Sequence, residues 1–415
     1  MKMQSKLSPS VILEYKKCTG CTACVKGCPT NAIRVRNKKA VIKKDLCIDC
    51  GECIRVCPSK AKKAVYDHFD QLKKNYKWSV VLVPPSLYGQ FSQLFDVNFV
   101  LTGLINMGFN DVFEVSRAAE IISLRTKSIV ANRNYQKPLI NSSCPVVVKL
   151  IESKYPDLLD NIIPVISPVK LAARMARDEA VEKTGYASED IGVFFISPCP
   201  GYVTEEGNYD NKSSELSGIL SINEIYLPLL KEMNKIQNPT FISTASSTGI
   251  EWAITGGEAA VLDCDKYLSA DGIENIIKVL DEIENERLIR VDFAELNACT
   301  GGCVGGVFTV ENPFLAKTRI IKLSKEYACK SSGISQDSID KYSSVLERRF
   351  TYRPVMTLDN NILGALEKIK KIEKLTGEFP GLDCGACGAP SCKVLAEDIV
   401  NGWANKDDCP LIKST

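Results

Sequence analysis

The sequence predicts an α/β protein of several domains, and three observations carry this prediction. The chain has 415 residues, of which 45% are hydrophobic and 25% charged, which is typical of a globular protein with two or three domains. Short β-branched runs alternate with helical patterns through the central part of the chain. Eighteen cysteines gather in short motifs, several of them C-x-x-C, and thereby mark small separate modules at both ends.

Five central segments define the expected α/β architecture. Buried β-branched and aromatic runs predict strands at 79–84, 111–115 and 191–196. Helical patterns follow at 146–155 and 169–176, and the second begins with a serine cap and a first-turn proline. Because ligands gather at strand ends in such folds, we expect the central cysteines there. No Gly-x-Gly-x-x-Gly follows a strand, so a nicotinamide or flavin site is not supported.

Residues 1–70 contain one cysteine pattern twice, C-x2-C-x2-C-x3-C followed by proline. This run is typical of bacterial ferredoxins with two [4Fe-4S] clusters, and its fourth cysteine ligates the other cluster. Two alternating segments between the copies, 32–36 and 39–43, predict a β-hairpin. We expect an α+β ferredoxin-like domain with one cluster on Cys18, Cys21, Cys24 and Cys57 and a second on Cys47, Cys50, Cys53 and Cys28.

The N-terminal module is basic, because residues 1–75 contain 17 lysines and arginines but 6 acidic residues. This charge predicts a docking face for an acidic electron carrier of the ferredoxin or flavodoxin type. The alternative is a solvated surface that offsets the negative charge of clusters. Nucleic-acid binding is not expected, because no aromatic platform accompanies the basic residues.

The sequence also predicts the compartment. No apolar stretch reaches about 18 residues and the N-terminus lacks an export signal, so we expect no membrane contact and a cytoplasmic location. The clustered cysteines of such a chain favour thiolate metal ligands over disulfides. The oligomeric state does not follow from these features.

Four central cysteines lie in three motifs: Ser-Ser-Cys144-Pro, Ser-Pro-Cys199-Pro and Cys299-Thr-Gly-Gly-Cys303-Val-Gly-Gly. With the segment at 255–260, these motifs resemble the signatures of the [FeFe] hydrogenase family, in its divergent or sensory-type branches. The resemblance implies a two-lobed α/β domain at 78–360 with a [4Fe-4S] cube on these four cysteines. The glycines are expected to let the backbone approach the cluster sulfides. Buried structural thiols are the alternative.

The resemblance also shows where this chain departs from catalytic members, which add a diiron unit to the cube. Their proton-delivering cysteine corresponds to Ser143, and the lysine that holds a cyanide corresponds to Tyr202. Two methionines of the cavity wall correspond to Ser197 and Asn297, and the stretch 124–129 lacks the family's glutamate. A neutral phenol binds an anion less strongly than an ammonium does. These four residues are therefore candidates for the cavity, and none is assigned as catalytic.

Residues 361–415 predict a third module. Apolar residues at three-to-four spacing over 361–378 predict an amphipathic helix, and a second helix is expected at 393–403. The cysteines between and after them resemble a four-iron domain of corrinoid and carbon-monoxide metabolism, and zinc is the alternative. A fourth [4Fe-4S] cluster is expected on Cys384, Cys387, Cys392 and Cys409. Cys264 and Cys329 remain, and ordinary half-buried thiols are expected there.

Three functions are compatible with these features. The first is electron transfer, or redox or gas sensing, through a central cube that lacks an efficient diiron site. The second is a genuine or hydrogen-sensing [FeFe] hydrogenase with a six-iron cluster, which interconverts protons and hydrogen. The third is iron–sulfur cluster trafficking. The complete pair of ferredoxin-type cysteine runs favours electron transfer over cluster trafficking.

Overall fold

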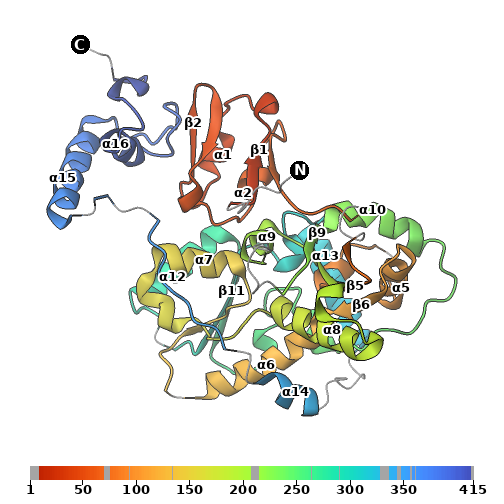
Figure 1. The fold of residues 1–415 in the computed structure, drawn as a ribbon. Coiled ribbons are helices and arrows are strands. Elements are labelled where there is room, and N and C mark those ends of the chain that lie inside the picture. The colour runs from red at the N-terminus through yellow and green to blue at the C-terminus, as the bar shows by residue number, and fades with distance from the viewer. Residues whose placement is uncertain are drawn as a thin grey trace. The chain divides into compact units, whose positions relative to one another are not determined.

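The chain forms two compact units in the computed structural model (Figure 1). One contains Tyr66–Tyr352, and the other combines Ser8–Val65 with Arg353–Thr415. The structure describes residues 9–69, 75–92, 94–132, 134–206, 215–262, 264–288, 290–327, 336–343, 347–355, 358–359 and 361–412. Within these residues no helix combines the length and the apolar character needed to cross a membrane.

The larger unit contains a four-stranded parallel sheet. Its strand order is β6 (Asp111–Glu114), β5 (Trp78–Val83), β8 (Ile191–Ser197) and β9 (Gly218–Ser221). The strands predicted at 79–84, 111–115 and 191–196 are thereby confirmed, although Val115 begins a helix rather than ending a strand. Continuous apolar runs at β5 and β8 are expected, because a parallel sheet is buried on both faces.

Helices cover both faces of this sheet. On one face α6 (Val115–Ala131) packs with α8 (Pro168–Thr184), and on the other α5 (Asn98–Asn106) packs with α10 (Ile222–Met233). Successive residues of a strand point to opposite faces, so β5 divides its side chains between the two cores. The α6/α8 core receives Val80 and Leu82, and the α5/α10 core receives Val81 and Val83.

A second parallel sheet has the order β10 (Tyr267–Asp271), β11 (Phe293–Asn297), β7 (Leu139–Ile140). The predicted helix at 146–155 is α7 (Pro145–Lys154), and α12 (Ile273–Glu284) packs against β10 and β11. The two sheets make the α/β unit two-lobed. Its other described helices are α4 (Pro85–Tyr88), α9 (Pro200–Glu206), α11 (Ser247–Glu251), α13 (Pro313–Glu326) and α14 (Gln336–Ser343).

The ferredoxin-like part of the second unit repeats one arrangement. The predicted hairpin pairs β2 (Ile33–Arg36) with β3 (Lys39–Ile42), and β1 (Val11–Leu13) pairs with β4 (Lys62–Ala64). Each cysteine run folds into a loop and one short helix, α1 (Ala23–Lys26) or α2 (Glu52–Arg55).

The C-terminal residues of the second unit form two helices, α15 (Ile362–Glu378) and α16 (Cys392–Val400). Both predicted helices are therefore present, although α16 ends before Trp403. Their shared core is small, with Ile372, Phe379 and Leu395 at its centre.

The two parts of the second unit are joined by a buried carboxylate. Asp398 of α16 accepts hydrogen bonds from Arg34, Arg36 and Lys43, which lie on or next to the hairpin. The Val35 N–H also donates to the Gly388 carbonyl at 2.8 Å. In Figure 1 α16 accordingly lies beside β2.

Candidate functional site

The central cysteines follow the carboxyl ends of parallel strands. Cys144 comes four residues after β7, Cys199 two after β8, and Cys299 two after β11. This placement confirms the expectation that these motifs lie at strand ends, where α/β folds gather ligands.

Cys144 and Cys199 also lie at helix N-termini, those of α7 and α9. Burial raises the pKa of the Cys144 thiol, while N–H groups of Ala298, Val147 and Val146 counteract it. Burial likewise raises the pKa of Cys199, against N–H groups of α9. Free N–H groups at a helix N-terminus stabilise negative charge, so both positions favour a sulfur that carries it.

Cys299 and Cys303 bracket a glycine turn, and Cys303 begins a 3-10 turn rather than a regular helix. Burial raises the pKa of Cys303, and the Cys144 and Cys299 sulfurs raise it further. Cys303 and Cys144 also raise the pKa of Cys199. The four sulfurs therefore lie within electrostatic reach of one another in a buried region.

The glycines of this turn lie close to the backbone of neighbouring segments. Gly302 has φ +92°, and a Cβ there would lie 2.7 Å from the Thr255 nitrogen. A Cβ on Gly306 would meet the Pro198 carbonyl oxygen. These contacts show that the glycines let three cysteine-bearing or cavity-lining segments pack together. Their expected approach to cluster sulfides stays a prediction.

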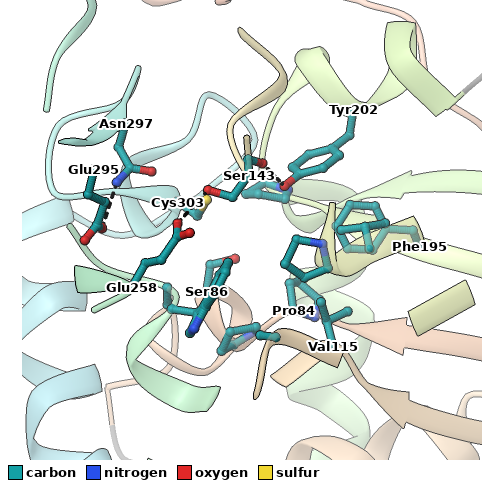
Figure 2. A pocket seen from close by; sticks show the side chains of 17 residues that line it. Pro84, Ser86, Val115, Ser143, Phe195, Tyr202, Glu258, Glu295, Asn297 and Cys303 are labelled. Atoms are coloured by element: carbon teal, nitrogen blue, oxygen red, sulfur yellow. Dashed lines mark hydrogen bonds between the residues drawn. The ribbon is translucent and has the colours of Figure 1, made fainter. Parts of the chain in front are cut away.

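A small cavity of about 50 Å³ adjoins Cys303 (Figure 2). Ser143, Tyr202 and Asn297 line it, as the sequence predicted for the cavity. Glu258 and Glu295 line it as well. The Ser143 hydroxyl donates to Glu258 Oε2 at 3.0 Å, and the Asn141 side-chain amide donates to the same oxygen at 3.2 Å.

The two glutamates differ in their hydrogen bonds. Glu295 accepts backbone N–H bonds from Gly256 and Ala259, both at 2.9 Å, and thereby fixes the segment that carries Glu258. Burial raises the pKa of Glu295. Burial raises the pKa of Glu258 to about 8, and the nearby Glu295 carboxylate adds to this effect. Glu258 is therefore largely protonated at neutral pH.

The hydroxyls of Tyr202 and Ser197 both donate to backbone carbonyls, so neither is a free donor in the cavity. The Tyr202 hydroxyl donates to the Ser143 carbonyl at 3.1 Å, and its ring packs edge-on against Phe195. Ser197 does not line the cavity; its hydroxyl donates to the Cys199 carbonyl at 2.8 Å. Asn297 donates to Glu295 at 3.1 Å.

Sequence reasoning missed the carboxyl group of this cavity. The stretch 124–129 indeed carries no carboxylate, but Glu258 reaches Ser143 from another segment. The signal was present in the segment at 255–260, which was recognised as family-like without a role for its glutamate.

The ferredoxin-like cysteines group as their spacing predicts. Burial raises the pKa of Cys24, and the other sulfurs that raise it are those of Cys57, Cys18 and Cys21. Burial raises the pKa of Cys50 in the same way, together with the sulfurs of Cys28, Cys53 and Cys47. The fourth cysteine of each run thus lies with the three cysteines of the other.

The four C-terminal cysteines surround one cavity of about 10 Å³, lined by Cys384, Cys387, Cys392 and Cys409. Nowhere in the described part of the chain do three cysteine, histidine or acidic side chains converge on a single ion. A four-iron cube instead binds one thiolate at each of four separate corners.

Two cysteines and the chain's one histidine belong to none of these sulfur sets. Cys264 is half-buried and packs against the larger core, and Cys329 lies outside the described residues. His68 pairs with Glu224 at 2.7 Å.

Three family models match the chain. Residues 77–263 and 232–307 match "iron only hydrogenase large subunit, C-terminal domain". Residues 10–59 match a 4Fe-4S dicluster domain, and residues 379–411 match a putative Fe-S cluster domain.

Two curated relatives are similar to the chain. Iron hydrogenase 1 of Clostridium pasteurianum is 25% identical over 374 residues, covering 72% of this chain and 64% of the relative. The NADP-reducing hydrogenase subunit HndD of Solidesulfovibrio fructosivorans is 25% identical over 256 residues, covering 49% and 44%. The chain thus spans less than two thirds of the length of either relative.

Solved structures share the fold. The [FeFe]-hydrogenase HydA(deltaEFG), from a study of stepwise H-cluster assembly, superposes with a TM-score of 0.53 at 15% identity, covering 69% of this chain and 96% of that one. A variant of the apo [FeFe]-hydrogenase HydA1 from Chlamydomonas reinhardtii also gives 0.53 at 15% identity, covering 66% and 94%. These likenesses confirm the predicted α/β fold.

Proposed function

Since the chain belongs to the family of the iron-only hydrogenase large subunit, we propose that it is a redox protein with four [4Fe-4S] clusters and no efficient diiron site. In this proposal a central cube on Cys144, Cys199, Cys299 and Cys303 exchanges electrons with the ferredoxin-like and C-terminal clusters. The observation that carries it is the contrast between the four converging sulfurs and the adjacent cavity, which is lined by Ser143 and Tyr202 where catalytic family members have a cysteine and a lysine.

The central sulfurs fit a cube. The Cys303 sulfur lies within electrostatic reach of the other three, and Cys144 and Cys199 receive backbone N–H groups at helix N-termini. Such donors stabilise a thiolate-bound cluster, whose overall charge is negative. When bound, the cube would supply one-electron chemistry, and the chain's part is to hold it on these four thiolates.

The cavity does not fit a diiron unit. Its lining lacks two groups that serve a diiron unit in catalytic members of the family, because Ser143 stands where they have a proton-delivering cysteine and Tyr202 where they have a lysine. The Tyr202 hydroxyl donates to the Ser143 carbonyl, so it does not replace the lysine that holds a cyanide. We therefore derive no hydrogen chemistry through a diiron unit.

One observation favours a second candidate, a sensory or slow hydrogenase. Glu258 and Ser143 form a hydrogen-bonded pair inside the cavity, and a carboxyl with a pKa of about 8 exchanges protons near neutral pH. The cavity therefore retains a route for protons. In the first candidate this pair instead provides a proton that compensates charge when the adjacent cube is reduced.

An acidic electron carrier of the ferredoxin or flavodoxin type remains our proposed partner at the N-terminal module, on the strength of its basic charge. A cytoplasmic location belongs to the same proposal.

The test is anaerobic iron quantitation of Cys299→Ala beside Cys264→Ala. Both variants lose one half-buried thiol, but only Cys299 belongs to a four-sulfur set. We expect Cys299→Ala to lose about four irons per chain while the reduced ferredoxin-type electron paramagnetic resonance signals persist. Cys264→Ala is expected to keep the iron content of the parent protein.

Equal iron in the two variants would refute the central cube. Carbonyl and cyanide infrared bands in the parent protein would favour the second candidate.

A further inference from the structure

The ferredoxin-like module contains a lysine that is buried without a hydrogen-bond partner. Lys62 begins β4, is 2% exposed, and ranks among the largest fully buried side chains of the described residues. Its Nζ is buried and donates no hydrogen bond to any acceptor among the described residues. A buried ammonium without compensation is costly, so a negative group that belongs beside it would account for its position.

The internal repeat shows that packing alone does not require a lysine. The first copy reads Cys28-Pro-Thr-Asn-Ala-Ile33 and the second reads Cys57-Pro-Ser-Lys-Ala-Lys62. Ile33 holds the equivalent position at the start of β2 and is also 2% exposed. The second copy therefore places a cation where the first has a hydrocarbon.

Both predicted ferredoxin-type clusters have a ligand near this cation. Cys24 and Cys53 are both buried in the small core of this module, and Lys62 lies within electrostatic reach of both sulfurs. Cys24 belongs to one sulfur set and Cys53 to the other. The Lys62 backbone N–H also lies against the Cys57 sulfur. One side chain thus lies between both sets.

We propose that Lys62 is a shared positioning cation that raises the reduction potentials of both ferredoxin-type clusters. The inference rests on the proposed clusters of this module. Each cluster with its four thiolates gains one electron from a low-potential one-electron donor, and its net charge changes from −2 to −3. No bond forms or breaks. The nearby positive charge stabilises the reduced form more than the oxidised form.

The experiment is a potentiometric titration of the full chain with dithionite, followed by electron paramagnetic resonance. Lys62→Met removes the buried cation and keeps an unbranched side chain. Lys63→Met is the matched control, because it removes the same charge at the next residue. The Lys63 side chain is half-exposed and pairs with Glu14. We expect Lys62→Met to disfavour reduction at least tenfold, a shift of about 59 mV to lower potential for a one-electron couple.

The reciprocal variant Ile33→Lys is expected to shift the midpoints upward, and it keeps the test decisive if Lys62→Met loads clusters poorly. Midpoints of Lys62→Met that match those of Lys63→Met, with normal iron content, would overturn the role of Lys62. Absence of ferredoxin-type signals from the parent protein would instead refute the proposed clusters, so the two failures are distinguishable.

Discussion

Replacing Asp398 by asparagine tests how the C-terminal helices are held to the hairpin. The Asp398 side chain is 2% exposed and accepts bonds from Arg34 Nε at 2.5 Å, Arg36 Nη2 at 3.1 Å and Lys43 Nζ at 2.8 Å. Arg34 is itself only 5% exposed, so the substitution leaves a buried guanidinium without its counter-charge.

The expected cost follows from this burial. Removing one partner of a buried ion pair destabilises by about 3–5 kcal/mol. At about 1.4 kcal/mol per tenfold change, local opening of α16 becomes at least about a hundredfold more frequent. Hydrogen exchange of the amides in residues 392–400 measures this opening directly, under anaerobic conditions that preserve clusters.

Glu373→Gln is the matched control, because it makes the same carboxylate-to-amide change at an exposed position of α15. A surface change of this kind is expected to stay within about 0.5 kcal/mol. If the two variants exchange at the same rate in α16, the buried carboxylate does not hold the two parts together and the reasoning fails.

Two further predictions concern the central unit. Because the pKa of Glu258 is raised to about 8, the folded state keeps a proton that the unfolded chain loses above about pH 4.5. This carboxyl therefore lowers the free energy of unfolding by at most about 5 kcal/mol as pH rises from about 4.5 to about 8. Glu258→Gln is expected to remove this contribution in urea unfolding at pH 5 and pH 8.5, and an unchanged pH dependence would contradict the prediction. Gly302→Ala is expected to lower the melting temperature more than Gly185→Ala does. Both glycines have positive φ, but only at Gly302 would a Cβ meet the Thr255 backbone. Equal losses of melting temperature in the two variants would show that this close approach is unimportant.

Local patterns in the sequence were sufficient for much of the fold. Buried runs located β5, β6 and β8, and the Ser-Pro pair at 167–168 located the start of α8, because caps and strand periodicity depend on neighbouring residues. The ferredoxin-like sulfurs could be grouped because the repeated run has a known ligation pattern, in which the fourth cysteine of each run joins the other set. Val115 differed because its apolar character suits the first turn of α6 as well as the end of a strand.

Long-range contacts could not be derived in this way. Glu258 and Ser143 are 115 residues apart, and Asp398 and Arg34 are 364 apart, so only the folded topology pairs them. The Ile33 and Lys62 difference was visible in the repeat, yet its meaning depends on burial that the spacing does not reveal. The roles of Tyr202 and Ser197 could not be predicted, because each hydroxyl donates to a backbone carbonyl, and only Tyr202 lines the cavity.

The most direct test of the central claim is infrared spectroscopy of the anaerobically matured protein, combined with its iron content. We predict about sixteen irons per chain, four in each cluster, and no bands from iron-bound carbon monoxide or cyanide. Such bands together with about two additional irons would contradict this, because they would place a diiron unit beside Ser143 and Tyr202, which replace the cysteine and the lysine that serve one in catalytic family members.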